Sequence, residues 1–133
     1  MKRDISDKTD IIKLVDSFYG KVKSDKLLGN IFDEILQVNW EKHLPKMYDF
    51  WDNILFGTNN YQGRPFPPHL EVNDKITLTN EHFQCWINLF YATVDEHFIG
   101  NNAENIKQRA SSIKQIFNYK INFINHHQNE IKK

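Results

Sequence analysis

Apolar residues recur along much of the chain at the three- and four-residue spacing that is typical of amphipathic helices. Over residues 8–23 one stripe of such positions carries Ile11, Val15, Phe18 and Val22, with Ile12 and Tyr19 beside it. This pattern predicts a helix with one buried face. We expect Ser6 or Thr9 to cap its start, because a hydroxyl can accept a hydrogen bond from a free N–H group of the first turn.

A second helix is predicted over residues 40–56. Asn39 is placed to cap it and Gly57 to end it, since glycine readily adopts the left-handed conformation that follows many helices. The apolar positions of this helix are Trp40, Leu44, Met47, Trp51, Ile54 and Leu55. Between the first two helices, residues 27–32 have the pattern of a turn followed by a short apolar piece.

Two further helices are predicted at about 79–99 and 102–127. Thr79 is expected to cap the first of them and Gly100 to close it. The first stripe carries Phe83, Trp86, Phe90, Val94 and either His97 or Phe98, and the second carries Ile106, Ala110, Ile113, Phe117, Ile121 and Ile124. No segment of useful length alternates as a strand does, so the pattern predicts an all-α fold.

Residues 57–77 interrupt this pattern. They hold two glycines and three prolines, and no helical stripe runs through them. We expect a long loop here, and loops of this length inside a compact domain are often functional. The 133 residues are otherwise the size of one domain, so the prediction is a single domain over 1–133 with its core at about 8–125.

The balance of charge argues against two classes of partner. Basic and acidic residues number 17 each, so the formal net charge is zero. With no basic excess to displace counterions, nucleic-acid binding is not expected, and no apolar run approaches the roughly 20 residues of a membrane span. Cys85 is the single cysteine and cannot form an internal disulfide, so a reducing cytoplasm is the expected location.

His69 is the histidine with the most unusual setting. It follows three closely spaced prolines, which fix the backbone φ angle and stiffen the preceding segment. Flanked by Phe66 and Leu70, a neutral imidazole on such a segment could meet a metal with little reorganisation. The residues alone favour a plainer alternative, a partly exposed loop histidine with a local hydrogen bond.

Tyr19, His43 and Trp86 each bring a polar atom to an apolar helical stripe. A buried hydroxyl, imidazole or indole N–H needs a partner, and each of these could find one within the protein. If they converge, they aim three polar groups into one apolar cavity that suits a small diatomic ligand. The other histidines, His82, His97, His126 and His127, have the settings of capping or solvated groups, and a zinc site is not expected from them.

Taken in order, these residues resemble the group III truncated haemoglobins. The matching segments span about residues 10–117 and are Phe18–Val22, Asp25–Phe32, His43–Trp51, Tyr61–Pro65 leading to His69, His82–Phe90, Thr93–Glu96 and Gln108–Ala110. Each segment alone is a weak match, but the set in this order and at these separations is specific. The resemblance implies a shortened globin fold, a two-over-two helical sandwich around one haem b. The haem would be non-covalent, since CxxCH is absent.

The resemblance also assigns roles to residues. His69 matches the proximal ligand of the haem iron, and Tyr19, His43 and Trp86 match residues on the distal side, where the gas binds. The expected pocket lining is Phe18, Phe32, Met47, Phe50, Trp51, Phe66, Leu70 and Phe83. Some relatives carry a basic residue immediately before the proximal histidine, where this chain has a proline. Lys46 and Arg64 are therefore the candidate partners of the haem propionates, with plain solvation of both as the alternative.

The function implied by the resemblance is binding of O₂, NO, CO or another diatomic ligand. Three distal donors would hold a partly negative ligand strongly and slow its release. That favours chemistry, such as oxidation of NO by O₂ or a peroxidase-like reaction with an unidentified electron donor. Two alternatives stay open: a module that stores, scavenges or senses a gas without turnover, and a helical interaction domain without haem.

Overall fold

The computed structural model describes residues 2–31, 39–59, 61, 63, 69, 72–73 and 77–132, without the side chains of 128–132. Within these residues the regular elements are the helices α1 (Lys8–Ser24), α2 (Trp40–Phe56), α4 (Asn80–His97) and α5 (Asn101–Lys132). The extended pairing found in the described part of the chain is an isolated bridge between Arg3 and Phe98. The all-α prediction is confirmed. None of the described helices is long and apolar enough to cross a membrane.

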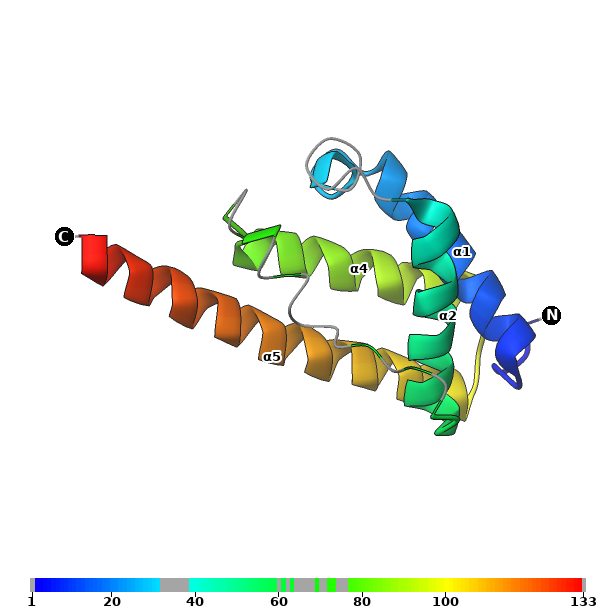
Figure 1. Cartoon of the computed structure of the whole chain (residues 1–133). Helices are drawn as coiled ribbons and strands as arrows, with labels where there is room; N and C mark the ends of the chain where they lie inside the picture. Colours follow the sequence, from blue (N-terminus) through cyan, green and yellow to red (C-terminus); the bar gives the residue numbers. More distant parts are fainter. Residues whose placement is uncertain are drawn as a thin grey trace.

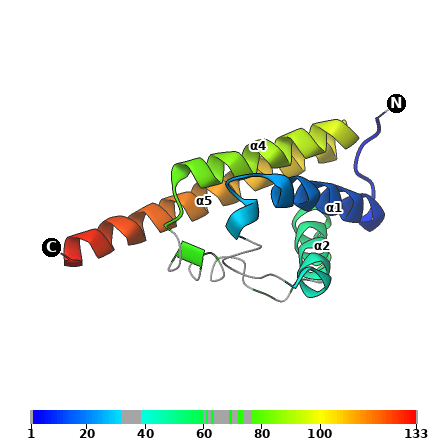
Figure 2. The ribbon, with the colours of Figure 1, turned by 90° about the horizontal axis from the view of Figure 1, so that it is seen from above.

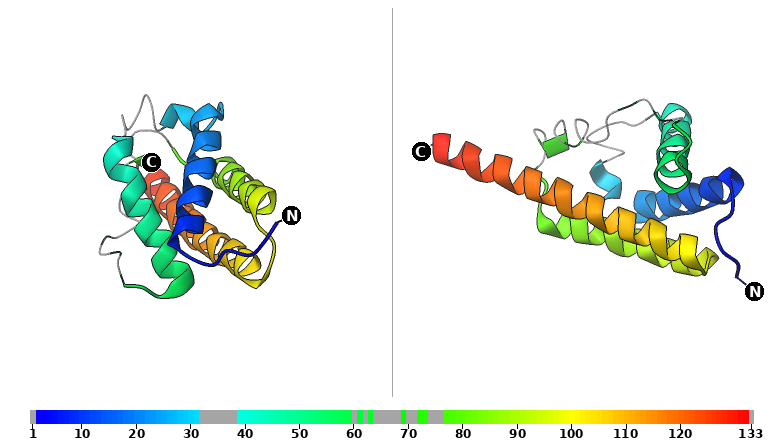
Figure 3. Two further views of the ribbon diagram at one scale, coloured as in Figure 1. Left: turned by 90° about the vertical axis from the view of Figure 1, so that its right-hand side faces the viewer. Right: turned by 90° about the horizontal axis from the view of Figure 1, so that it is seen from below.

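The helices form two layers, one of α1 and α2 and the other of α4 and α5. α4 and α5 run antiparallel and side by side, and α2 crosses α5 rather than following it (Figures 1 and 2). α1 contacts both α2 and α4, so each helix packs against two others. The C-terminal end of α5 projects beyond the other described helices (Figure 3).

The predicted apolar stripes form the core. On α1 the stripe residues Ile11, Val15, Phe18 and Val22 are all at most 1% exposed. Phe90 and Val94 on α4 and Ile106, Ala110 and Ile121 on α5 are fully buried. Burial of such side chains stabilises the fold by roughly 1.5–3 kcal/mol for each of the larger ones. The spacing of apolar residues therefore decides which face of each helix turns inward.

The cap of α1 differs from the prediction. Asp7 is the N-cap, and its carboxylate accepts a hydrogen bond of 3.2 Å from the Asp10 N–H. Ser6 and Thr9 were the expected caps, and that prediction is wrong. The Ser6 hydroxyl and backbone N–H instead bond the Asp10 carboxylate, at 3.0 and 2.9 Å. The Ser6 oxygen also accepts a hydrogen bond of 3.1 Å from the Arg3 guanidinium, so the hydroxyl is engaged by this ion pair and not by the helix end.

The remaining helix ends follow the predictions more closely. Asn39 is the N-cap of α2 without a side-chain capping bond, and Gly57 ends that helix with a φ of 67°. Thr79 is the N-cap of α4. α4 ends earlier than expected, at His97, because Phe98 leaves the helix for the extended bridge to Arg3. α5 in turn continues to Lys132, past the predicted end at 127.

The segment expected as a loop, 57–77, contains helical backbone. His69, Val72 and Asn73 are helical, and the last two are buried. All three prolines precede His69 in sequence. Proline interrupts a helix interior but is tolerated before a helix or in its first turn. The composition of the whole segment therefore concealed the helical backbone of these three residues, which follow its prolines in sequence.

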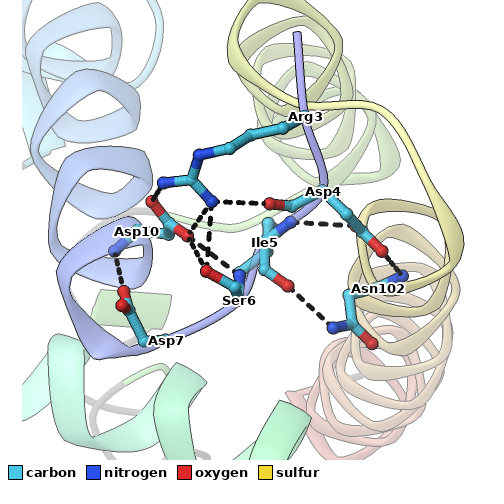
Figure 4. Close-up of polar contacts among 7 residues, drawn as sticks. All are labelled: Arg3, Asp4, Ile5, Ser6, Asp7, Asp10 and Asn102. Carbon is cyan, nitrogen blue, oxygen red and sulfur yellow. Dashed lines mark hydrogen bonds and ion pairs between the residues drawn. The ribbon is translucent and has the colours of Figure 1, made fainter.

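The N-terminal segment joins the two layers (Figure 4). The Asp4 carboxylate accepts hydrogen bonds of 2.9 Å from the N–H groups of Asn102 and Ala103, the first turn of α5. The Asn102 side chain donates to the Ile5 carbonyl at 2.7 Å. Ile5 is fully buried between these bonds. A short extended segment thus caps α5 and covers one end of the core.

Candidate functional site

Tyr19 and His43 lie against each other across the α1–α2 contact. Their ring centroids are 5.4 Å apart, with the planes almost perpendicular. Trp40 touches both, at 5.4 Å from the Tyr19 ring and 5.6 Å from the His43 ring. Because Trp40 and His43 are three residues apart on α2, one helical face presents both rings to α1. Two of the three predicted distal residues are therefore brought together.

Trp86, the third, is connected to them through Phe18. The Phe18 ring lies 5.1 Å from Tyr19 and 5.8 Å from Trp86 in edge-on contacts. On its other side Trp86 stacks on Phe90 at 5.7 Å and on Trp51 at 6.4 Å. Rings from α1, α2 and α4 thus form one continuous aromatic cluster. Such contacts each contribute about 0.5–1.5 kcal/mol beyond area burial.

The polar groups in this cluster are held in their neutral forms. Burial raises the pKa of the Tyr19 phenol far above its ordinary value, because the phenolate would be poorly solvated there. Burial, together with the positive charge of Lys46, lowers the pKa of His43. At neutral pH the cluster therefore offers a protonated hydroxyl and an uncharged imidazole.

The other predicted lining residues are only partly accounted for. Phe50 and Trp51 are buried and in ring contact at 4.9 Å, and Phe83 is buried on α4. Met47 is half-buried against the core. Lys46, the candidate propionate partner, is exposed. Four further predicted residues lie outside the described part of the chain: Phe32, Arg64, Phe66 and Leu70.

His69 is half-buried, and its aromatic neighbour is not one of the predicted distal residues. Its imidazole meets the ring of Phe117 on α5, 4.8 Å between centroids and tilted by 66°. None of the contacts described above joins it to Tyr19, His43 or Trp86. An imidazole set edge-on against a phenyl ring is restricted in rotation.

Sequence reasoning missed two members of these contacts, Trp40 and Phe117. Both had been placed on apolar stripes, as core residues. For Trp40 the available signal was its spacing of three residues from His43. For Phe117 no local signal exists, because His69 and Phe117 are 48 positions apart and meet only through the packing of α5.

The remaining histidines and the cysteine have ordinary structural contacts. His82 is buried at the start of α4, where its Nδ1 accepts a hydrogen bond of 3.0 Å from the Thr79 N–H. His97 contacts the Ser17 hydroxyl at 2.9 Å. The Cys85 thiol donates to Asp25, and burial with that carboxylate raises its pKa to about 11. Over the described residues, no three His, Cys, Asp or Glu side chains gather as a metal site.

The site combines two features with chemical capacity. One is an aromatic cluster with neutral polar groups, fitted to hold a small polar molecule by hydrogen bonds in apolar surroundings. The other is the imidazole of His69, which is in helical backbone and follows three prolines in sequence. Several large apolar side chains near these features stay only partly buried, among them Leu44, Met47, Trp86, Ile113 and Phe117.

Comparison with known protein families gives a match over most of the chain. The profile of the bacterial-like globins matches residues 4–122. The matched range includes the N-terminal residue that caps α5, all of α1, α2 and α4, and most of α5.

Individual relatives agree with this match. A group 3 truncated haemoglobin of Campylobacter jejuni is 32% identical over 120 residues, which cover 88% of this chain and 92% of the relative. The crystal structure of a group III truncated haemoglobin from Campylobacter jejuni superposes with a TM-score of 0.79 at 31% identity, covering 91% of this chain and 95% of the other. The predicted resemblance and the predicted shortened globin fold are confirmed.

Proposed function

The chain belongs to the bacterial-like globin family, whose members bind ligands at haem, and we propose that it holds one non-covalent haem b through His69 and reacts with diatomic gases there. The single observation that carries the proposal is the Tyr19–His43–Trp86 set within one aromatic cluster. A cluster of rings alone would be an ordinary core. This cluster differs because it also carries three side chains that can donate a hydrogen bond, one each from α1, α2 and α4.

The residues present fit a haem. A porphyrin is flat and largely apolar, and partly buried Leu44, Met47, Ile113 and Phe117 supply apolar surface that the protein itself leaves incompletely covered. A neutral imidazole is the commonest protein ligand of haem iron in globins. Lys46 is exposed, as a residue that pairs with a propionate at the rim of the haem should be.

On the distal side, the chain's own residues determine how a gas is held. The haem supplies the iron that binds the gas and that can be oxidised or reduced. The Tyr19 hydroxyl stays protonated because burial raises its pKa, so it can donate a hydrogen bond. His43, whose pKa is lowered, donates through its one N–H as a neutral ring. The Trp86 indole N–H is a donor at any pH.

This set of donors supports a reaction in preference to delivery of the gas. Hydrogen bonds in a desolvated site slow the release of a partly negative ligand. We infer that the protein detoxifies NO or related reactive species. Conversion of NO and O₂ into nitrate consumes one electron per cycle, so this function needs an electron donor. Such chemistry suits a cytoplasmic protein, where reductants are abundant.

An absorbance titration tests the haem site. Purified protein supplied with haem is expected to give a one-to-one complex with an intense Soret band and a ferrous–CO spectrum typical of a histidine ligand. His69→Ala should alter that spectrum and weaken haem binding by at least about tenfold. The control is His127→Ala on the exposed end of α5, which should change neither. An unchanged His69→Ala spectrum would assign the iron to another residue.

A second measurement separates reaction from simple binding. Under O₂, with a reductase and its reduced cofactor, the haem-loaded protein should consume many equivalents of NO and release nitrate. Consumption of a single equivalent per haem would instead favour a storage, scavenging or sensing role. Absence of any Soret band would leave only a haem-free interaction domain.

A further inference from the structure

Asn73, Leu78 and Asn125 form a closed ring of hydrogen bonds. The Asn73 side-chain carbonyl accepts a bond of 2.9 Å from the Leu78 N–H, and its amide donates to the Asn125 carbonyl oxygen at 2.7 Å. The Asn125 amide in turn donates to the Leu78 backbone carbonyl at 3.3 Å. Each amide therefore uses both its donor and its acceptor within three residues.

The position of this ring relates it to His69. Asn73 follows His69 by four residues, and both residues are in helical backbone. Asn125 follows Phe117 by eight residues on α5, about two turns and on the same face. His69 and Asn73 thus each contact α5, His69 by its ring contact with Phe117 and Asn73 by its bond to Asn125.

The two contacts with α5 differ in how strongly they fix the position of a residue along that helix. A contact between two rings tolerates sliding and tilting by several degrees at little cost. A hydrogen bond from a buried amide is less tolerant, because Asn73 is buried and its amide, once displaced, loses a partner that water replaces poorly there. Asn73 is 8% exposed. The amide pair is therefore the attachment that fixes the position of the segment along α5.

We propose that Asn73 and Asn125 are positioning residues, a clamp that sets the orientation of the His69 imidazole toward the haem iron. The proposal rests on the proposed function, in which His69 is the iron ligand. Asn73 is four residues from His69 in the chain, so holding Asn73 against α5 limits how far His69 can move. This gives a role to the asparagine on α5, because its bond to Asn73 holds that residue against the helix that carries Phe117.

Asn125→Ala is the main variant, because it severs the bond to α5 and leaves the Asn73–Leu78 bond in place. The primary readout is the iron–histidine stretching band of the ferrous protein in resonance Raman spectra, with haem transfer to a high-affinity acceptor as the second. We expect the band to shift or broaden and haem loss to accelerate by about tenfold, a typical effect for residues that support metal ligands. Asn125→Asp keeps the acceptor for Asn73 but loses the donor to Leu78, so its band should lie between those of Asn125→Ala and the unaltered protein.

Asn122→Ala is the matched control. Asn122 lies one turn earlier on α5 and donates to the Asn80 side chain at 2.9 Å on the exposed surface, so it is also an amide bridge from α5 to another segment. It should leave the band and haem loss unchanged. In the haem-free protein, amide hydrogen exchange at Leu78 should be faster in Asn73→Ala than in the unaltered chain, which reports the Asn73–Leu78 bond of the ring without any haem.

The outcomes separate the two proposals. A native iron–histidine band and native haem loss in a folded Asn125→Ala protein would overturn the clamp and leave the haem site intact. Equal effects of Asn122→Ala and Asn125→Ala would overturn it too, since general loosening of α5 would then suffice. If Asn125→Ala does not fold, a native band and native haem loss in a folded Asn73→Ala protein would overturn the proposal. Absence of the band from the unaltered protein would overturn the proposed ligand, whatever the exchange at Leu78 shows.

Discussion

The Tyr19 phenol ring meets the His43 imidazole edge-on, with 5.4 Å between their centroids. The contact joins α1 to α2 and lies beside Trp40, which touches both rings. Two polar side chains that could each have been an isolated core residue are thereby held as one unit. In the proposed function this pair supplies hydrogen-bonding groups on the distal side, and the ring contact fixes their separation.

Replacing Tyr19 with Phe should speed O₂ dissociation from the haem-loaded protein. The change removes one hydroxyl and keeps the ring that packs on Phe18. Loss of one hydrogen bond in a desolvated site is worth about 0.5–1.5 kcal/mol, which corresponds to a roughly two- to tenfold faster rate. Stopped-flow displacement of O₂ by CO measures it. Tyr48→Phe is the control, because the Tyr48 hydroxyl bonds Asp16 at the α1–α2 surface instead. An equal effect of both changes would remove Tyr19 from the distal network.

Truncating Trp40 should loosen the same pair. Trp40→Ala removes the ring that contacts Tyr19 and His43, and with it the cation–π contact of Lys23, whose ammonium lies 4.2 Å from the Trp40 ring centroid. We expect O₂ dissociation to accelerate several-fold, as in the loss of one hydrogen bond. Trp40→Phe keeps a ring and should lie close to the unaltered protein in the same stopped-flow measurement. A Phe variant as fast as the Ala variant would show that the indole itself matters.

Removing the Asp4 carboxylate should destabilise the fold away from the site. Asp4→Ala leaves the N–H groups of Asn102 and Ala103 without their acceptor at the start of α5. Loss of a capping side chain reduces the free energy of unfolding by about 0.5–2 kcal/mol. Chemical denaturation followed by circular dichroism measures the change. Asp95→Ala, which removes an exposed salt bridge to Lys107, should alter stability by less than about 0.5 kcal/mol.

The Arg3–Asp10 ion pair should make stability depend on acid pH. Asp10 is buried, and its hydrogen bonds from Arg3, followed by those from Ser6, hold its pKa at about 2, below the ordinary 3.8. Because the carboxyl pKa is lower in the folded protein, the ionised group stabilises the fold at pH values above its unfolded-state pKa of 3.8. That contribution is lost as the pH falls from 3.8 toward 2. We expect about 1–2 kcal/mol to disappear over this range.

The variant that tests this pair is Arg3→Gln. It should lower stability at neutral pH and flatten the loss of stability between pH 4 and 2, because the folded pKa of Asp10 then returns toward the unfolded value. Lys8→Gln, at the exposed pair with Asp49, serves as the comparison. Parallel acid-unfolding curves for Arg3→Gln and the unaltered protein would contradict the assignment.

The sequence was most informative where a property repeats along the chain. The stripe of Ile11, Val15, Phe18 and Val22 specified both a helix and its buried face, since burial of apolar surface outweighs local preferences. Caps were less secure. Ser6 was a reasonable choice for α1, but its hydroxyl is bound by the Asp10 carboxylate, a contact that depends on how the chain turns before the helix.

The sequence by itself identified Tyr19, His43, Trp86 and His69 as the candidate site residues, through their residue types and a family pattern. Only the tertiary structure decided which of them meet: Tyr19 and His43 touch directly, Trp86 joins them through Phe18, and His69 packs on Phe117. The reason is physical. Periodicity encodes the face that a helix buries, but the partner across that face depends on how helices far apart in sequence cross, and no local pattern records the crossing.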